Sequence, residues 1–191
     1  MIISSKERLY NVISTEIGGG GLNNSKLFFK TNRFSLLWLL RYTEYFSSRK
    51  DFFGRIMFRI FLKRYNRVQV LTGCTIPLEV FDEGLTIYHT GSIVVNGKTR
   101  IGRNCCIMNN VNIGANNGEK EAPRIGDNVY IGPGAVIFGN IEIADNCYIG
   151  ANAVVNKTVS EKGSVLLGVP AVVAKKSELV WWQKNNMSRE L

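Results

Sequence analysis

His89, the only histidine of the chain, is the side chain best suited to move a proton at neutral pH. It lies in the segment Thr86-Ile-Tyr-His-Thr-Gly-Ser-Ile-Val-Val-Asn-Gly97, and the Thr-Gly pair after it is typical of a turn that would project the imidazole into a cleft. A lone histidine is more often an ordinary surface residue, so position alone does not make it catalytic. As a general base, however, it could deprotonate a hydroxyl that then attacks a carbonyl carbon.

The four cysteines do not suggest a disulfide or a metal site. Cys74, Cys105, Cys106 and Cys147 contain no CxxC pair, and the adjacent Cys105 and Cys106 are poorly placed to bridge each other. Because the chain has a single histidine, we expect no zinc site. We expect small, buried, reduced side chains instead.

Length and composition predict a soluble globular protein of one domain, or of one domain with an appendage. The chain has 191 residues, of which 45% are hydrophobic and 20% charged. Apolar runs such as 36–40 are far shorter than the roughly 20 residues of a membrane span. The N-terminus lacks the regions of a secretory signal. We therefore expect a cytoplasmic protein.

The positive charge is confined to residues 1–70. This segment holds 13 Lys and Arg against four Asp and Glu, which equals the net charge of +9 of the whole chain. We expect helices over 5–17, 33–45 and 51–65, with Gly18–Gly21 as a flexible connection that lacks the Lys-Ser/Thr ending of a P-loop.

The last of these helices is expected to be amphipathic. Phe53, Met57, Ile60 and Phe61 would line one side, while arginines and lysines reach solvent. We favour a helical cap over the open end of the following domain. Contact with an anionic membrane surface or glycan is a compatible second role. Nucleic-acid binding through this charge would be salt-sensitive and without sequence preference.

A repeat of six residues organises residues 71–176. An α-helix of period 3.6 cannot keep positions six apart on one face, and simple strand alternation would not skip in this way. Two inward positions per six residues therefore predict a parallel β-helix of short strands and tight turns, followed by a tail over 177–191 in which 178–184 form a short helix or an interface. The repeated aliphatic residues are Ile101, Ile107, Ile113, Ile125, Ile131, Ile137, Ile143, Ile149 and Val155. A second apolar residue follows each of them except Ile113 by four positions, at Cys105, Val111, Val129, Ala135, Ile141, Cys147, Ala153 and Val159.

Several motifs within residues 73–176 resemble the hexapeptide-repeat acyltransferases, in the branch that contains serine acetyltransferase. They are the His89-Thr-Gly turn, the loop after Ile113-Gly114, the Ile131-Gly-Pro-Gly-Ala135 turn, the Ile149-Gly-Ala-Asn-Ala-Val154 turn and Gly168-Val-Pro-Ala171. The resemblance implies a mainly β protein, a left-handed parallel β-helix with an α-helical N-terminal segment. It also implies a homotrimer with active sites between subunits, acetyl-CoA as donor and no permanently bound cofactor.

The resemblance also implies roles for individual residues. His89 would be the general base, and the backbone N–H of Ala115, beside Gly114, would stabilise the oxyanion. The pantetheine arm would pass Pro133, Gly134 and Ala151. Lys175 or Lys176 would meet the nucleotide phosphates, although both could equally be solvated lysines.

Three departures from the serine acetyltransferase pattern argue against L-serine as acceptor. Tyr88 and Cys74 stand where that branch has aspartates, and Ala122 stands where it has a second histidine. Without these groups, a substrate ammonium has no obvious partner in the cleft. A neutral or anionic polyhydroxylated acceptor fits better.

We therefore expect an acetyl-CoA-dependent O-acetyltransferase that acts on a carbohydrate hydroxyl, in the synthesis of a bacterial capsule or other surface polysaccharide. The enzyme would work in the cytoplasm or at the inner face of the membrane. Serine O-acetyltransferase activity and an inactive β-helix scaffold are the alternatives. The candidate acceptor contacts, each with an ordinary structural explanation beside it, are Tyr88 (sugar stacking or interface packing), Cys74, Asn109, Asn110 and Asn112 (sugar hydroxyls or corner turns) and the loop 119–121 (acceptor contact or solvated lip).

Overall fold

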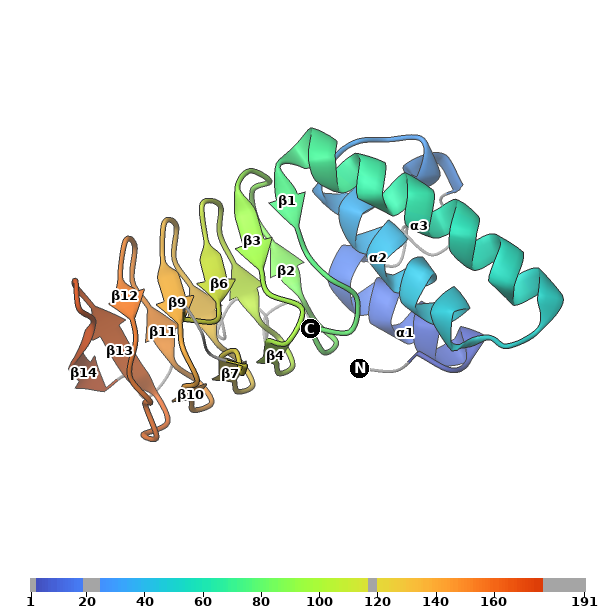
Figure 1. Cartoon of the computed structure of the whole chain (residues 1–191). Coiled ribbons are helices and arrows are strands. Elements are labelled where there is room, and N and C mark those ends of the chain that lie inside the picture. Colours follow the sequence, from blue (N-terminus) through green and yellow to red (C-terminus); the bar gives the residue numbers. More distant parts are fainter. Residues whose placement is uncertain (1–2, 19–24, 117–119, 177–191) are drawn as a thin grey trace.

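The computed structural model describes residues 3–18, 25–116 and 120–176 and divides them into a helical region and a β-helix. The helices gather at one end of the β-helix, and the last strand lies at the other end (Figure 1). Part of the Gly18–Gly21 connection, Glu119 and the C-terminal tail lie outside the described residues. Among the described residues, no helix is long and apolar enough to cross a membrane.

Three α-helices and one short 3-10 helix form the N-terminal region. Side chains of Ser5, Asn32 and Asp51 cap the N-termini of the three α-helices by accepting bonds from the first-turn amides. Helix α2 packs against both α1 and α3 and is the buried centre of the region. The elements are α1 (Lys6–Ile17), η2 (Ser25–Phe28), α2 (Arg33–Ser48) and α3 (Phe52–Thr72).

Helix α3 is longer than the sequence predicted and buries a different face. It continues to Thr72 and ends at Gly73, which adopts the left-handed conformation with φ 68°. Phe61 is buried and Met57 half-buried as predicted, but Phe53 and Ile60 are exposed. The buried face includes Tyr65 instead, because its hydroxyl donates a 2.7 Å hydrogen bond to the Ile76 carbonyl of the first coil.

Short parallel strands stack into three sheets that form the sides of a prism. The sheets have the orders β1-β3-β6-β9-β12, β4-β7-β10 and β2-β5-β8-β11-β13-β14, and only β13 and β14 pair antiparallel. The strands are β1 (Cys74–Thr75), β2 (Thr86–Ile87), β3 (Ile93–Val95), β4 (Arg100–Ile101), β5 (Cys106–Ile107), β6 (Asn112–Gly114), β7 (Arg124–Ile125), β8 (Tyr130–Ile131), β9 (Val136–Phe138), β10 (Glu142–Ile143), β11 (Tyr148–Ile149), β12 (Val154–Val155), β13 (Ser164–Leu167) and β14 (Val172–Lys176).

The six-residue repeat predicts the core of this prism correctly. All nine repeated aliphatic residues are buried, and each pairs in register with its counterpart on neighbouring coils, as Ile107 does with Ile131. Asparagines occupy corner positions at positive φ, where a short polar side chain is tolerated. Asn104, Asn128 and Asn146 form a ladder of side-chain hydrogen bonds of 3.0 and 3.1 Å along one corner.

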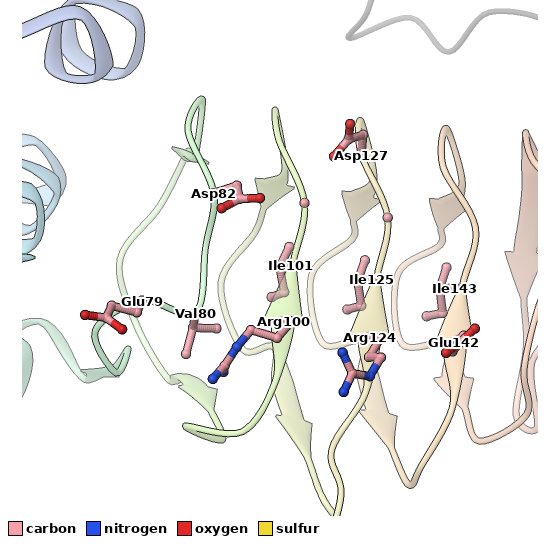
Figure 2. Close-up of a pocket in the computed structure, with 12 residues that line it drawn as sticks. Glu79, Val80, Asp82, Arg100, Ile101, Arg124, Ile125, Asp127, Glu142 and Ile143 are labelled. Atoms are coloured by element: carbon pink, nitrogen blue, oxygen red, sulfur yellow. The ribbon is translucent and has the colours of Figure 1, made fainter. Parts of the chain in front are cut away.

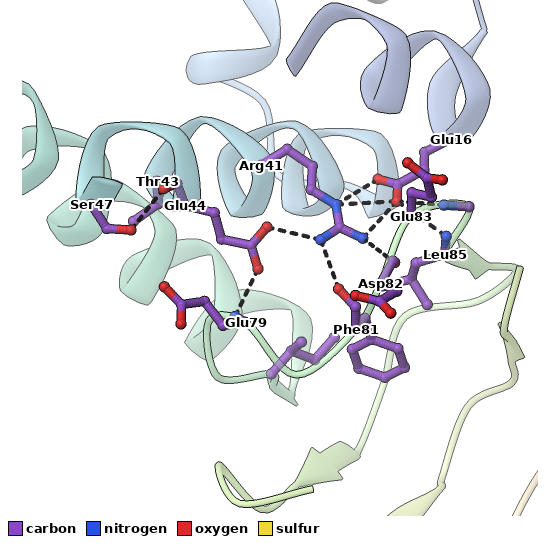
Figure 3. Close-up of polar contacts among 12 residues, drawn as sticks. Glu16, Arg41, Thr43, Glu44, Ser47, Glu79, Phe81, Asp82, Glu83 and Leu85 are labelled. Atoms are coloured by element: carbon purple, nitrogen blue, oxygen red, sulfur yellow. Dashed lines mark hydrogen bonds and ion pairs between the residues drawn. The ribbon is translucent and has the colours of Figure 1, made fainter. Parts of the chain in front are cut away.

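A buried guanidinium joins the helices to the first coil. Arg41 is fully buried, and all five of its N–H groups have acceptors (Figure 3). Two carboxylates, Glu16 from α1 and Glu44 from α2, bind it at 2.6 and 2.8 Å. Its remaining N–H groups donate to the carbonyl oxygens of Phe81 and Asp82 at 3.1 and 2.8 Å.

The same carboxylates also hold the backbone of residues 79–85. Glu44 accepts a 2.8 Å bond from the Glu79 amide, and Glu16 accepts 3.1 Å bonds from the amides of Gly84 and Leu85. Burial by itself lowers the pKa of Arg41, but the attraction of Glu16 and Glu44 outweighs it and raises the pKa, so that the guanidinium stays charged. Helix α1, helix α2 and the segment 79–85 are therefore fixed to one another, directly before strand β2.

Replacing Arg41 by methionine should destabilise the protein by about 3–5 kcal/mol, because Glu16 and Glu44 would be left buried without their cation. Urea unfolding followed by circular dichroism measures this free energy. The matched control is Arg103→Met, which removes an exposed ion pair with Asp127 and should cost less than about 1 kcal/mol. Equal losses in the two variants would contradict a structural role for the buried cluster.

Candidate functional site

His89 is an exposed residue in the turn that joins β2 to β3. Gly91, at φ 125°, and Ser92, at φ 41°, give this turn its shape. The carbonyl oxygen of Gly91 accepts a 3.0 Å hydrogen bond from the amide of Asn110 in the next coil. Within the described part of the chain, no side chain forms a hydrogen bond or an ion pair with the imidazole. The ring is therefore open to a substrate.

Arg33 fixes the backbone beside this histidine. It is the first residue of α2, and its Nη1 donates a 2.7 Å hydrogen bond to the carbonyl oxygen of Tyr88. This bond links residues 55 positions apart in the sequence. Sequence analysis missed it, because no local pattern shows that the start of α2 lies against the turn of His89.

Several of the predicted site residues lie on one edge of the prism, which we call the His89 edge. It consists of the turns between β2 and β3, β5 and β6, β8 and β9, and β11 and β12. Backbone hydrogen bonds connect them in order, from Gly134 to Asn109 (3.1 Å) and from Asn152 to Pro133 (2.9 Å). The edge gathers six predicted residues, His89, Asn109, Asn110, Pro133, Gly134 and Ala151.

Tyr88 belongs to a surface next to this edge, which we call the tyrosine face: Tyr88, Cys106, Met108, Tyr130 and Tyr148. Tyr130 and Tyr148 stack with their ring centroids 4.7 Å apart and their planes at 4°. Burial raises the pKa of the Cys106 thiol to about 12. Burial, together with the neighbouring Tyr148 and Cys106, raises the pKa of Tyr130 to about 12. Both side chains are thus neutral at physiological pH. The sequence could have indicated both residues, because each directly precedes an inward-facing isoleucine of the repeat and so points outward.

Gly114 and Ala115 lie on a different edge, where β6 ends and the loop to β7 begins. We call it the loop edge. Strand β6 crosses a whole side of the prism between the two edges, and its extended residues span about 10 Å at roughly 3.3 Å each. One chain therefore does not bring Ala115 next to its own His89.

Other predicted residues fall elsewhere. Cys74, predicted to contact the acceptor, is buried in the core at 3% exposure with its thiol 3.6 Å from the Thr72 carbonyl oxygen, because it occupies an inward position of β1. Its side chain is therefore not part of the candidate site. Ala122 is also buried, whereas Asn112 and Glu121 are exposed. Lys175 and Lys176 belong to β14, whose backbone pairs with β13 at the far end of the prism.

A separate groove of about 410 Å³ runs along the outer face of β4, β7 and β10 (Figure 2). Arg100, Arg124 and Glu142 come from three successive coils and give its lining mixed charge. No histidine, cysteine, serine or threonine is present among the described residues that line it. Its possible bases are carboxylates, among them Asp82 and Asp127, whereas the imidazole of His89, whose ordinary pKa is near neutral, lies at the His89 edge.

Comparison with known proteins agrees with this geometry. The family model "Bacterial transferase hexapeptide (six repeats)" matches residues 122–157. A search of curated protein sequences finds no match. Serine acetyltransferase from Neisseria gonorrhoeae has a similar structure, with a TM-score of 0.68 and 22% identity over 94% of this chain and 69% of that one.

Two further solved structures show the same relationship. The Neisseria gonorrhoeae enzyme in complex with serine has a TM-score of 0.66 and 25% identity over 87% of this chain and 69% of that one. Soybean serine acetyltransferase, as apoenzyme, has a TM-score of 0.63 and 23% identity over 87% of this chain and 66% of that one. Residues 122–157 thus match a hexapeptide transferase family, and the chain has the fold of the serine acetyltransferases. The fold class, predicted from the repeat and motifs, is confirmed.

If His89 is a catalytic base, Arg33→Ala should lower the kcat of acetyl transfer by about tenfold or more, since small displacements of a catalytic group are costly, and should leave the KM for acetyl-CoA unchanged. Arg33→Lys, which keeps one donor, should recover part of the rate. Steady-state kinetics with the best acceptor provide the measurement. The matched control is Arg49→Ala, which removes a guanidinium ion pair with Asp51 at the opposite end of α2. A rise in KM with unchanged kcat would contradict a positioning role for Arg33.

Proposed function

We propose that this protein is an acyltransferase that transfers an acetyl group from acetyl-CoA to a carbohydrate hydroxyl of a bacterial surface polysaccharide or of its precursor. The observation that carries the proposal is the position of the exposed His89 directly beside the uncharged tyrosine face. Such a site has a base for a hydroxyl and aromatic rings for a sugar. We place the enzyme in the cytoplasm.

The reaction would proceed directly in a complex of both substrates. His89 removes the proton of the acceptor hydroxyl as its oxygen attacks the thioester carbonyl, and a tetrahedral oxyanion forms. A backbone N–H, assigned to Ala115, donates to this oxyanion. When the C–S bond breaks, the acetyl ester remains on the acceptor and the CoA sulfur receives the proton from the imidazole.

The surroundings of His89 support a sugar over an amino acid. The positions that would hold an amino acid through carboxylates and a second histidine carry Cys74, Tyr88 and Ala122. Cys74 and Ala122 are buried, and only Tyr88 lies at the site. An ammonium group would therefore lack the carboxylates that these positions would supply, which is unfavourable. A sugar ring can instead stack on Tyr88, and the amides of Asn109 and Asn110 lie one coil away for its hydroxyls.

The donor would lie along the His89 edge. Pro133, Gly134 and Ala151 follow His89 on successive coils, and the pantetheine arm would pass them. The turn itself requires glycine at position 134, because its φ of 72° is a backbone conformation that side-chain-bearing residues rarely adopt. The nucleotide end would reach the coils near β14, where Lys175 or Lys176 would meet its phosphates.

The separation of the two edges supports an oligomer with shared sites. His89 and Ala115 can act on one thioester only if they come from two chains. In a closed ring of identical subunits, the His89 edge of one subunit can face the loop edge of the next. We propose the homotrimer on this ground and by resemblance.

An acetyl-transfer assay tests the acceptor class. CoA release from acetyl-CoA should occur with glycans from a panel and not with L-serine, and His89→Ala should lower the rate by about 10²–10⁴-fold. Tyr88→Ala should raise the KM for the glycan while leaving that for acetyl-CoA unchanged. Tyr88→Phe is its control, since it keeps the ring.

Serine O-acetyltransferase activity is the second candidate, because one of the similar structures is an enzyme in complex with serine. Turnover with L-serine, lost in His89→Ala, would favour it and overturn the sugar proposal. Failure of every acceptor together with absent acetyl-CoA binding would favour a scaffold.

A further inference from the structure

Helix α3 presents an unusual combination of side chains to solvent. Its 21 residues include five Lys and Arg and no Asp or Glu. Four of the cations, Arg55, Arg59, Lys63 and Arg67, are exposed and recur every four residues, so they form one ridge along the helix. We call it the cationic ridge.

An apolar ridge runs beside the cationic one. Phe52, Ile56 and Ile60 also recur every four residues and are 81%, 41% and 46% exposed. Phe53 lies next to them at 59% exposure. Large apolar side chains at such exposure on one helix face indicate a surface with a binding role.

A hollow of about 160 Å³ adjoins the same end of the helix. Phe53 lines it together with aromatic side chains of α1 and α2, including Tyr10 and Phe46. Lys6 and Arg49 are its charged residues. This apolar hollow with cations suits a lipid chain and its headgroup. The hollow thus continues the combination of apolar and basic side chains from α3 onto α1 and α2.

We propose that α3 lies in the surface of an anionic lipid bilayer, with Phe52, Phe53, Ile56 and Ile60 among the acyl chains and the cationic ridge at the lipid phosphates. Helices with basic residues beside Phe and aliphatic residues bind membrane interfaces in this way. Each cation near an anionic surface strengthens such binding, and salt weakens it. Helix α3 begins at the end of the helical region remote from the β-helix (Figure 1), and the side chains of the apolar ridge are exposed.

The residue types favour a bilayer over other partners. A polyanion such as a charged glycan or a nucleic acid would use the cationic ridge but would leave Phe52 and Ile56 in water. A second copy packed face to face would bring two cationic ridges together, and α3 has no acidic residue to pair with them. Only a surface that is both anionic and apolar matches both ridges. This inference does not depend on the acceptor proposed above.

Sedimentation of the full chain with lipid vesicles tests the proposal. The protein should bind vesicles of equal parts phosphatidylcholine and phosphatidylglycerol, bind phosphatidylcholine alone at least about tenfold more weakly, and lose binding as salt rises. Phe52→Ser/Ile56→Ser and Arg59→Glu/Lys63→Glu should each reduce binding at least about tenfold. The matched controls are Val172→Ser, an exposed apolar residue of β14, and Lys98→Glu/Lys157→Glu, exposed lysines of the β-helix that change the net charge equally.

A dye attached to α3 reports whether this helix inserts into the bilayer, and the measurement does not depend on variants that lose binding. The native cysteines are buried, so an environment-sensitive dye on Phe52→Cys should label this position selectively. Its emission should shift to the blue with anionic vesicles. An unshifted dye, or binding lost only in the charge variants, would show a polyanion-type surface and overturn the proposal. The protein could instead form concentration-dependent dimers that Phe52→Ser/Ile56→Ser abolishes, and not bind vesicles. That result would assign the apolar ridge to contact with a second copy and would also overturn the proposal.

Discussion

The buried guanidinium of Arg41 determines how the helical region and the β-helix of this protein fit together. A charge removed from water needs a full set of partners, and Arg41 finds them in Glu16, Glu44 and the carbonyl oxygens of Phe81 and Asp82. Because these partners come from α1, α2 and the segment just before β2, the ion cluster sets where the first coil begins. Arg33, at the start of the same helix α2, then bonds to the turn of His89. The helical region thus acts as part of the site's support as well as a cover for the end of the prism.

The β-helix provides the second constraint. Residues on successive coils stack directly over one another, so each edge of the prism becomes a continuous line of turns. One edge carries His89 and the turns assigned to the donor, and another carries Ala115. The tyrosine face lies beside the first edge and is neutral and aromatic. In the proposed mechanism, the base, the aromatic surface and the donor path therefore come from one edge, and the oxyanion donor comes from another subunit.

The sequence predicts the β-helix well because its signal is periodic: residues six apart, such as Ile107, Ile113 and Ile131, face the same core on every coil. The turns of the site could be predicted for the same reason. Contacts between distant segments could not, since no local pattern connects Arg33 with Tyr88, or Arg41 with Phe81. The exposure of Phe53 and Ile60 was also missed, because helical periodicity gives an apolar stripe but not the face that packs. Cys74 was assigned by position in a motif, and its inward orientation on β1 overrides that assignment.

The shared site can be tested most directly by mixing two inactive chains. His89→Ala lacks the base, and Ala115→Pro lacks the backbone N–H assigned to the oxyanion. If each site takes His89 from one chain and Ala115 from the next, random co-assembly of equal amounts in a closed ring leaves about one quarter of the sites intact. Co-expressed and co-purified mixtures should then show about one quarter of the wild-type acetyl-transfer rate. A mixture as inactive as either variant alone, or an active Ala115→Pro enzyme, would contradict the account.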